Sequence, residues 1–161
     1  MARGGTPAIV ALNAAGVQFR VHEFEADPVE RHFGNAAALA LGVELERVFK
    51  TLIATVDDRT HVVGIVPVSG QLSLKELAAA VHGKRAEMCQ PETAERLTGY
   101  VVGGISPFGQ KRPLPVVIDE TCVLFDSIFV SGGRRGLDIE IAAADLVAVL
   151  DAVTAPIGTS S

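Results

Sequence analysis

The spacing of apolar and polar residues divides the chain into short expected strands and helices. Segments with apolar alternation or a run of β-branched residues are typical of strands. The expected strands are 18–24, 48–56, 60–68, 100–102, 116–119, 127–130 and 137–141. Asp57-Asp58 separates the second and third of these at hairpin distance. We therefore expect 48–56 and 60–68 to pair as antiparallel neighbours.

Capping residues mark the helices between these strands. Thr6-Pro7 is a good helix start and Gly16 a good stop, while Ser73 and Glu76 form a capping-box pattern. The expected helices are 7–15, an Ala-rich helix ending near Gly42, 74–82, 91–99 and 142–150. The acidic segment 25–35 is expected to be a loop, and 154–161 a frayed tail.

This order of elements predicts an α/β fold of the mixed (α+β) kind. The irregular spacing contains no clean βαβ units, which favours a mixed sheet over a doubly wound parallel sheet. We expect a curved, barrel-like mixed sheet of about six or seven strands surrounded by helices. Residues 1–161 are expected to form a single domain, since that length buries roughly 70% of the surface that the unfolded chain exposes.

Composition and charge narrow the functional classes. The chain has one Tyr, seven Phe and no Trp, so aromatic platforms for stacking bases are not expected. A net charge of −5 disfavours a protein that coats nucleic acid, although it allows one that holds only the end of an RNA. Cations gather in two acid-free segments, 99–118 with Lys111-Arg112 and 127–137 with Arg134-Arg135.

The cysteines and histidines suggest no metal or thiol chemistry. Cys89 and Cys122 stand 33 positions apart without zinc-ligand spacing, so we expect free thiols in a reducing cytoplasm. The four histidines share no ligand spacing, and neither cysteine has a histidine nearby in the sequence, which disfavours a thiol nucleophile. No run of 18 apolar residues is present. We expect a cytoplasmic protein with no membrane span, metal or cofactor.

Lys50 is a cation inside an otherwise apolar strand. Strand alternation places it on the same face as Val48 and Leu52. Such a lysine either extends to solvent and protects an edge strand, or points into a pocket. In a pocket, a partly desolvated ammonium can stabilise developing negative charge or act as an amine base. The residues alone leave both interpretations open.

Two glycine-rich segments, 103–107 and 131–136, are candidate binding loops. Glycines allow backbone N–H groups to approach a ligand closely, and such turns can polarise a carbonyl or hold a ribose or phosphate. The alternative is a pair of ordinary turns between strands. Asp138 then either orients a lysine or satisfies loop N–H groups. Arg134 and Arg135 either bind phosphate or lie at a solvated hairpin tip.

Four long motifs together resemble a known family. VFKTL, PVSGQLSLKELAAA, TGYVVGGISPFGQKRPLP and FVSGGRRGLDIEIAAADL are similar to the bacterial Cys-tRNA(Pro) deacylases of the YbaK/EbsC type. These belong to the superfamily of prolyl-tRNA-synthetase-associated editing domains. The resemblance extends from about Thr6 to Asp151 and implies a barrel-like mixed sheet surrounded by helices.

The resemblance also implies an activity. Members hydrolyse the ester between a wrongly attached amino acid and the 3′-terminal ribose of a tRNA, typically cysteine on tRNA(Pro), and Cys-tRNA(Cys) is a further candidate. They act in trans, near or bound to prolyl-tRNA synthetase. The substrate's own thiol attacks its carbonyl, so that the reaction is formally that of a lyase. Two alternatives remain open: a non-catalytic module that binds tRNA ends or a synthetase, and a small-molecule binder unrelated to tRNA that uses the same pocket.

Residue by residue, the resemblance makes Lys50 the catalytic residue. The substrate-binding residues it implies are Phe24, Thr51, Gly103, Gly104, Ile105, Ser106, Pro107, Ser131 and Asp138. The expected contacts to tRNA phosphates are Lys111, Arg112, Arg134 and Arg135. Phe24 departs from the tyrosine that is common at its position, so a hydroxyl role is lost there while the ring can still shape the pocket.

Overall fold

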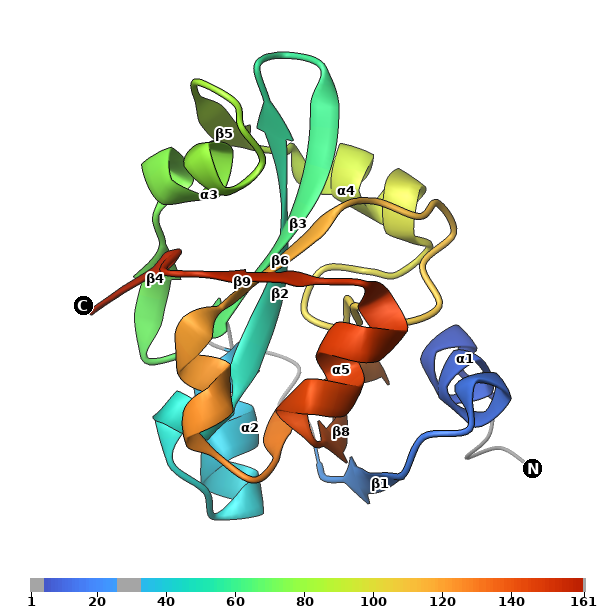
Figure 1. The fold of residues 1–161 in the computed structure, drawn as a ribbon. Coiled ribbons are helices and arrows are strands. Elements are labelled where there is room, and N and C mark those ends of the chain that lie inside the picture. The colour runs from blue at the N-terminus through green and yellow to red at the C-terminus, as the bar shows by residue number, and fades with distance from the viewer. Residues whose placement is uncertain (1–4, 26–32, 161) are drawn as a thin grey trace.

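The computed structural model describes residues 5–25 and 33–160 of the chain (Figure 1). Its helices are α1 (Pro7–Ala15), α2 (Phe33–Leu41), α3 (Leu74–Ala80), α4 (Pro91–Thr98) and α5 (Ala143–Leu150), with 3₁₀ helices η2 (Leu45–Arg47) and η3 (Glu120–Leu124). Its strands are β1 (Phe19–Glu23), β2 (Phe49–Val56), β3 (Thr60–Pro67), β4 (Gly70–Leu72), β5 (Ala86–Met88), β6 (Val116–Asp119), β7 (Ile128–Arg134), β8 (Leu137–Ile141), β9 (Val153–Ala155) and β10 (Gly158–Ser160).

The strands of the described residues form three hydrogen-bonded sheets. The largest has the order β5-β2-β3-β6-β9 and is mixed, because β2 pairs antiparallel with β3 and β5 whereas β6 pairs parallel with β3 and β9. The second has the antiparallel order β1-β8-β7, and the third pairs β10 with β4. The predicted mixed α/β class and the β2–β3 hairpin are confirmed. In the described part of the chain these ladders do not close into a barrel.

The strand prediction needs three corrections. Ten strands are present among the described residues, since three-residue strands such as β4 and β5 are too short to show a period in the sequence. Segment 100–102 is a loop and not a strand. The described part of the predicted frayed tail, up to residue 160, is ordered, because 153–155 extends the large sheet, Ile157 is fully buried and 158–160 pairs with β4. The expected acidic loop at 25–35 lies mostly outside the described residues.

The predicted helix caps are present. The Thr6 hydroxyl accepts a hydrogen bond from the Ile9 N–H at 3.2 Å, and Gly16 ends α1 with a φ of 73°. The Ser73 hydroxyl accepts one from the Glu76 N–H, also at 3.2 Å. Only this half of the capping box forms, because the Ser73 N–H donates to the Ile157 carbonyl at 2.7 Å and not to the Glu76 side chain. Helix α3 ends at Ala80, two residues before the expected end.

Apolar side chains gather on both faces of the large sheet. One buried cluster joins residues of β2, β3 and β6 to β7, β8 and helices α1, α4 and α5. A second cluster joins the opposite face of the sheet to α3 and Ile157. A third, smaller cluster holds α2 against Val48 and Phe129. No helix among the described residues is long and apolar enough to span a membrane.

Candidate active site

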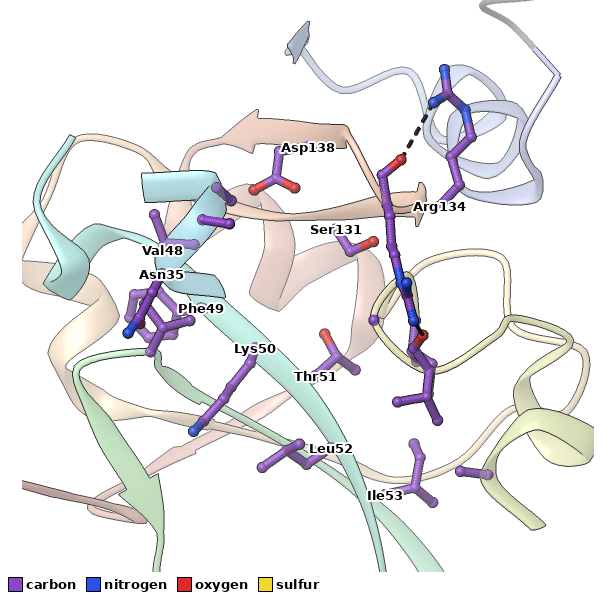
Figure 2. A pocket seen from close by; sticks show the side chains of 18 of the residues that line it. Asn35, Val48, Phe49, Lys50, Thr51, Leu52, Ile53, Ser131, Arg134 and Asp138 are labelled. Atoms are coloured by element: carbon purple, nitrogen blue, oxygen red, sulfur yellow. Dashed lines mark hydrogen bonds between the residues drawn. The ribbon is translucent and has the colours of Figure 1, made fainter. Parts of the chain in front are cut away.

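A cavity opens where strands β2 and β7 separate. The two strands meet at a parallel bridge between Val48 and Phe129, and on the other side β5 pairs only with residues 54–56 of β2. The first half of β2 therefore borders an open space of about 690 Å³ (Figure 2). The predicted site residues that line it are Phe24, Lys50, Thr51, Gly103, Ile105, Ser131, Arg134, Arg135 and Asp138.

Lys50 contributes a cation to the cavity wall. Its side chain is half-buried, and this burial lowers the pKa of its ammonium group from the ordinary value. No carboxylate among the described residues pairs with it. In Figure 2 the side chain extends from β2 away from Ser131 and Asp138. Asp138 therefore does not contact Lys50 in the described structure.

Thr51 points to the opposite face of β2 from Lys50, because consecutive strand residues alternate. It shares its face with the core residues Phe49 and Ile53. The Thr51 residue is only 8% exposed, and its Oγ1 is the buried side-chain polar atom that has no hydrogen-bond partner in the described structure. Such an atom costs about 1–3 kcal/mol of stability. Uncompensated groups of this kind are rare and often mark functional sites.

Ser131 and Asp138 are direct partners across the β7–β8 ladder, so both side chains lie on the same face. Asp138 is 7% exposed, and burial raises the pKa of its carboxyl group to about 7. The described residues supply it with no hydrogen-bond or ion-pair partner. The Ser131 hydroxyl accepts a hydrogen bond from the Gly133 N–H at 3.2 Å. Near neutral pH, Asp138 can therefore either donate or accept a hydrogen bond.

The double-glycine segment forms a tight turn beside the cavity. The Gly104 N–H donates to the Val101 carbonyl at 2.9 Å, and Gly103 adopts a φ of 92°, which suits the third position of a type II turn. The Gly104 N–H is therefore engaged within the turn and is not available to a ligand. Gly103 and Ile105 line the cavity, and their N–H groups make no hydrogen bond within the described part of the chain.

Three residues of the predicted binding loop, Gly104, Ser106 and Pro107, do not line the cavity. Ser106 is fully buried, and its hydroxyl accepts from the Phe108 N–H at 3.3 Å. Pro107 is also buried. Gly104 is needed for a contact within the protein, because a Cβ there would lie 2.6 Å from the Cα of Arg134. These residues shape the loop without facing the cavity.

The four predicted phosphate-binding residues occupy two different places. Arg134 and Arg135 line the cavity, and Arg134 is paired with the exposed Glu23 at 2.7 Å. Lys111 and Arg112 are exposed but do not line it. Their backbone N–H groups bond to carbonyls at the end of α4, which keeps the two residues beside that helix.

The cavity wall also contains residues that the sequence did not single out. Asn35 on α2, Gln71 on β4 and Cys89 after β5 are among them. Neither cysteine has a histidine nearby in the sequence, but the fold brings one to Cys89. The Cys89 Sγ lies 3.6 Å from Nδ1 of His61. The pairing of β5 with β2, and of β2 with β3, brings Cys89 close to His61. Only the register of these strands could have revealed this proximity.

The comparison with known families decides the identity of the domain. The sequence model described as an aminoacyl-tRNA editing domain matches residues 32–149, which is well over half of the chain. The chain belongs to the aminoacyl-tRNA editing domain family. This confirms the resemblance drawn from the motifs, and the cavity described above lies largely within the matched residues.

Relatives cover most of this editing domain. One is named Cys-tRNA(Pro)/Cys-tRNA(Cys) deacylase EbsC, from Enterococcus faecalis; it is 36% identical over 138 residues, which are 85% of this chain and 84% of the relative. Another is the multifunctional Ser/Thr-tRNA deacylase ProXp-y of Escherichia coli K12, 29% identical over 88% of this chain and 84% of the relative. A crystal structure described as a trans-editing enzyme for prolyl-tRNA synthetase shares the fold, with a TM-score of 0.84, 24% identity and 96% coverage of both chains.

Proposed function

We propose that this chain is a trans-acting aminoacyl-tRNA deacylase that removes cysteine from mischarged tRNA(Pro) and from Cys-tRNA(Cys). Membership of the editing-domain family and the 36% identity to a relative named for these substrates support the proposal. The observation that carries it is the half-buried Lys50, which no described carboxylate neutralises, in a cavity whose wall also holds Thr51 and Asp138, two residues whose side chains have no partner among the described residues.

Each polar group has a role suited to an aminoacyl ester. The Lys50 ammonium stabilises the negative charge that develops on oxygen as the ester is attacked. The free N–H groups of Gly103 and Ile105 are donors for the carbonyl and the terminal ribose. Asp138 and Ser131 bind the hydroxyl and amino groups of the substrate, and the Phe24 ring shapes the pocket.

The reaction needs little from the enzyme beyond positioning. The cysteine thiol of the substrate attacks its own carbonyl carbon. A carbon–sulfur bond forms, the ester bond to the ribose breaks, and the thiol proton passes to the departing ribose oxygen. The tRNA leaves with its terminal hydroxyl. The protein contributes alignment of the reacting atoms and electrostatic stabilisation. This chemistry requires neither a cofactor nor a thiol of the enzyme.

The charge distribution supports recognition of the tRNA end alone. Arg134 and Arg135 line the cavity, and we assign to them the last phosphates of the acceptor strand. With a net charge of −5, the rest of the protein repels the tRNA body. We propose that prolyl-tRNA synthetase supplies the remaining affinity, so that the isolated protein binds tRNA weakly and in a salt-sensitive manner.

Lys50→Met tests the proposal, with Lys75→Met on the exposed face of α3 as the matched control. Purified proteins are assayed with Cys-, Ala-, Ser- and Pro-tRNA, with and without prolyl-tRNA synthetase. We expect fastest release from Cys-tRNA(Pro), a loss of about 100-fold or more in Lys50→Met, and no loss in Lys75→Met. Hydrolysis no faster than in buffer would indicate the non-catalytic binding module instead. Normal turnover by folded Lys50→Met would remove Lys50 from the mechanism.

A further inference from the structure

Cys89 belongs to a polar cluster on the large sheet. Its backbone N–H donates to the Ile53 carbonyl at 3.0 Å, which fixes it beside β2. Its Sγ lies 3.2 Å from Oγ1 of Thr55 and 3.6 Å from Nδ1 of His61. Thr55 and His61 are direct partners in the β2–β3 register, and their side chains are 3.2 Å apart. The cluster is therefore held in place by backbone pairing of three strands.

This arrangement favours nucleophilic reactivity of Cys89. An unprotonated imidazole nitrogen can take the proton of an adjacent thiol, and the resulting thiolate is the reactive form. Cys89 is partly exposed. The other cysteine differs in each respect: Cys122 is fully buried, and burial raises the pKa of its thiol to about 11. Cys122 therefore serves as the unreactive control cysteine within the same chain.

Cys89 also lies in the wall of the candidate active site. Its partner in the backbone bond, Ile53, is two residues along β2 from Thr51, a spacing of about 6–7 Å. Thr51 lines the same cavity, although its hydroxyl oxygen is buried from solvent. A group attached to the Cys89 sulfur would therefore occupy part of the cavity that a substrate enters.

We propose that Cys89 is a site of reversible modification by small disulfides, and that the adduct closes the cavity to substrate. The thiolate attacks one sulfur of the disulfide, forming a new S–S bond to Cys89 and breaking the old one. The other half leaves as a thiolate and takes the proton held by His61. A second small thiol reverses the exchange. The closure of the cavity, unlike the modification, rests on the proposed deacylase function.

The modification is tested by mass spectrometry of the native protein treated with oxidised glutathione. We expect one adduct per chain, on Cys89, formed at least 10-fold faster than any on Cys122. Cys122→Ser should react like the unaltered protein, Cys89→Ser should not react until it is unfolded, and folded His61→Gln should react several-fold more slowly at neutral pH. Equal reactivity of the two cysteines, or no reaction of native Cys89, would overturn the proposal. An unchanged rate in His61→Gln would overturn the role of the histidine.

The closure is tested by deacylation of Cys-tRNA(Pro) before and after treatment. We expect the Cys89 adduct to lower the rate at least 10-fold and dithiothreitol to restore it, whereas treated Cys89→Ser keeps its own untreated rate. Full activity of the adduct would refute the closure. Absence of deacylation in untreated protein would instead refute the proposed function and the closure with it, while the labelling result would still decide whether Cys89 is modified.

Discussion

Gly104 and Arg134 are in direct backbone contact, although 30 positions separate them. A Cβ atom at position 104 would lie 2.6 Å from the Cα of Arg134 and 2.9 Å from its carbonyl carbon. The absence of a side chain at Gly104 thus allows the two glycine-rich segments to pack together. This packing positions the Gly103–Ile105 donors next to the β7–β8 hairpin that carries Ser131 and Asp138.

Gly104→Ala should therefore force the two segments apart. The obstacle is backbone and not a flexible side chain, so we expect the free energy of unfolding to fall by about 1–3 kcal/mol. Deacylation should fall at least 10-fold, because the cavity donors move. Gly16→Ala is the matched control: its φ of 73° costs about 1–2 kcal/mol for a residue with a side chain, but no atom within 4 Å meets the new Cβ. Denaturant melts and rate measurements on both variants separate loss of stability from loss of the site.

Thr51→Val should stabilise the protein and weaken its function. Valine has nearly the same shape and removes a buried oxygen that has no partner among the described residues. We expect the free energy of unfolding to rise by about 1 kcal/mol and kcat/KM for Cys-tRNA(Pro) to fall several-fold. Chemical denaturation and steady-state kinetics measure the two effects. A valine variant that is less stable than the original would mean that the hydroxyl already has a partner in the folded protein.

Asp138→Asn should change the dependence of stability on pH. The folded-state pKa of Asp138, about 7, lies above its ordinary value of 3.8, so between these values the folded state holds a proton that the unfolded state has lost. This contribution favours the folded state at low pH and is lost as pH rises from about 4 to about 7, by about 1.4 kcal/mol per pH unit at most. The asparagine variant lacks the titration. The unfolding free energy of Asp138→Asn minus that of the unaltered protein should therefore increase as pH rises from about 4 to about 7, and stay constant above pH 7.

The check is a series of urea melts from pH 4 to pH 8 on both proteins. Subtracting the unfolding free energy of one protein from that of the other at each pH cancels the contribution of the groups that titrate alike in both. A difference that does not change with pH would show that the Asp138 carboxyl group titrates equally in the folded and unfolded states.

Arg134→Ala with Arg135→Ala should weaken tRNA binding more than Lys111→Ala with Arg112→Ala. The first pair lines the cavity, whereas the second lies outside its wall. We expect the slope of log affinity against log salt concentration to become shallower by about one for each phosphate that the variant no longer neutralises. Filter binding at several salt concentrations measures it. A larger effect of the Lys111-Arg112 pair would place the phosphates along that loop.

Local patterns predicted much of the fold. The caps at Thr6 and Ser73 and the β2–β3 hairpin depend on residues a few positions apart, and all are present. The three-residue strands β4, β5, β9 and β10 were missed because their pairing partners lie far along the chain. The alternation of apolar residues also located Lys50 correctly within a strand, but it could not tell a pocket from solvent.

By itself, the sequence determined the family, the mixed α/β class and the residue types available for chemistry, because motifs and caps are properties of short contiguous segments. Only the tertiary structure decided which of those residues share a cavity. It directs Lys50 away from Asp138, assigns Gly104 to a backbone contact, and brings Cys89 to His61. The physical reason is that strand pairing between distant segments sets the face and the neighbours of each side chain, and no local period encodes that register.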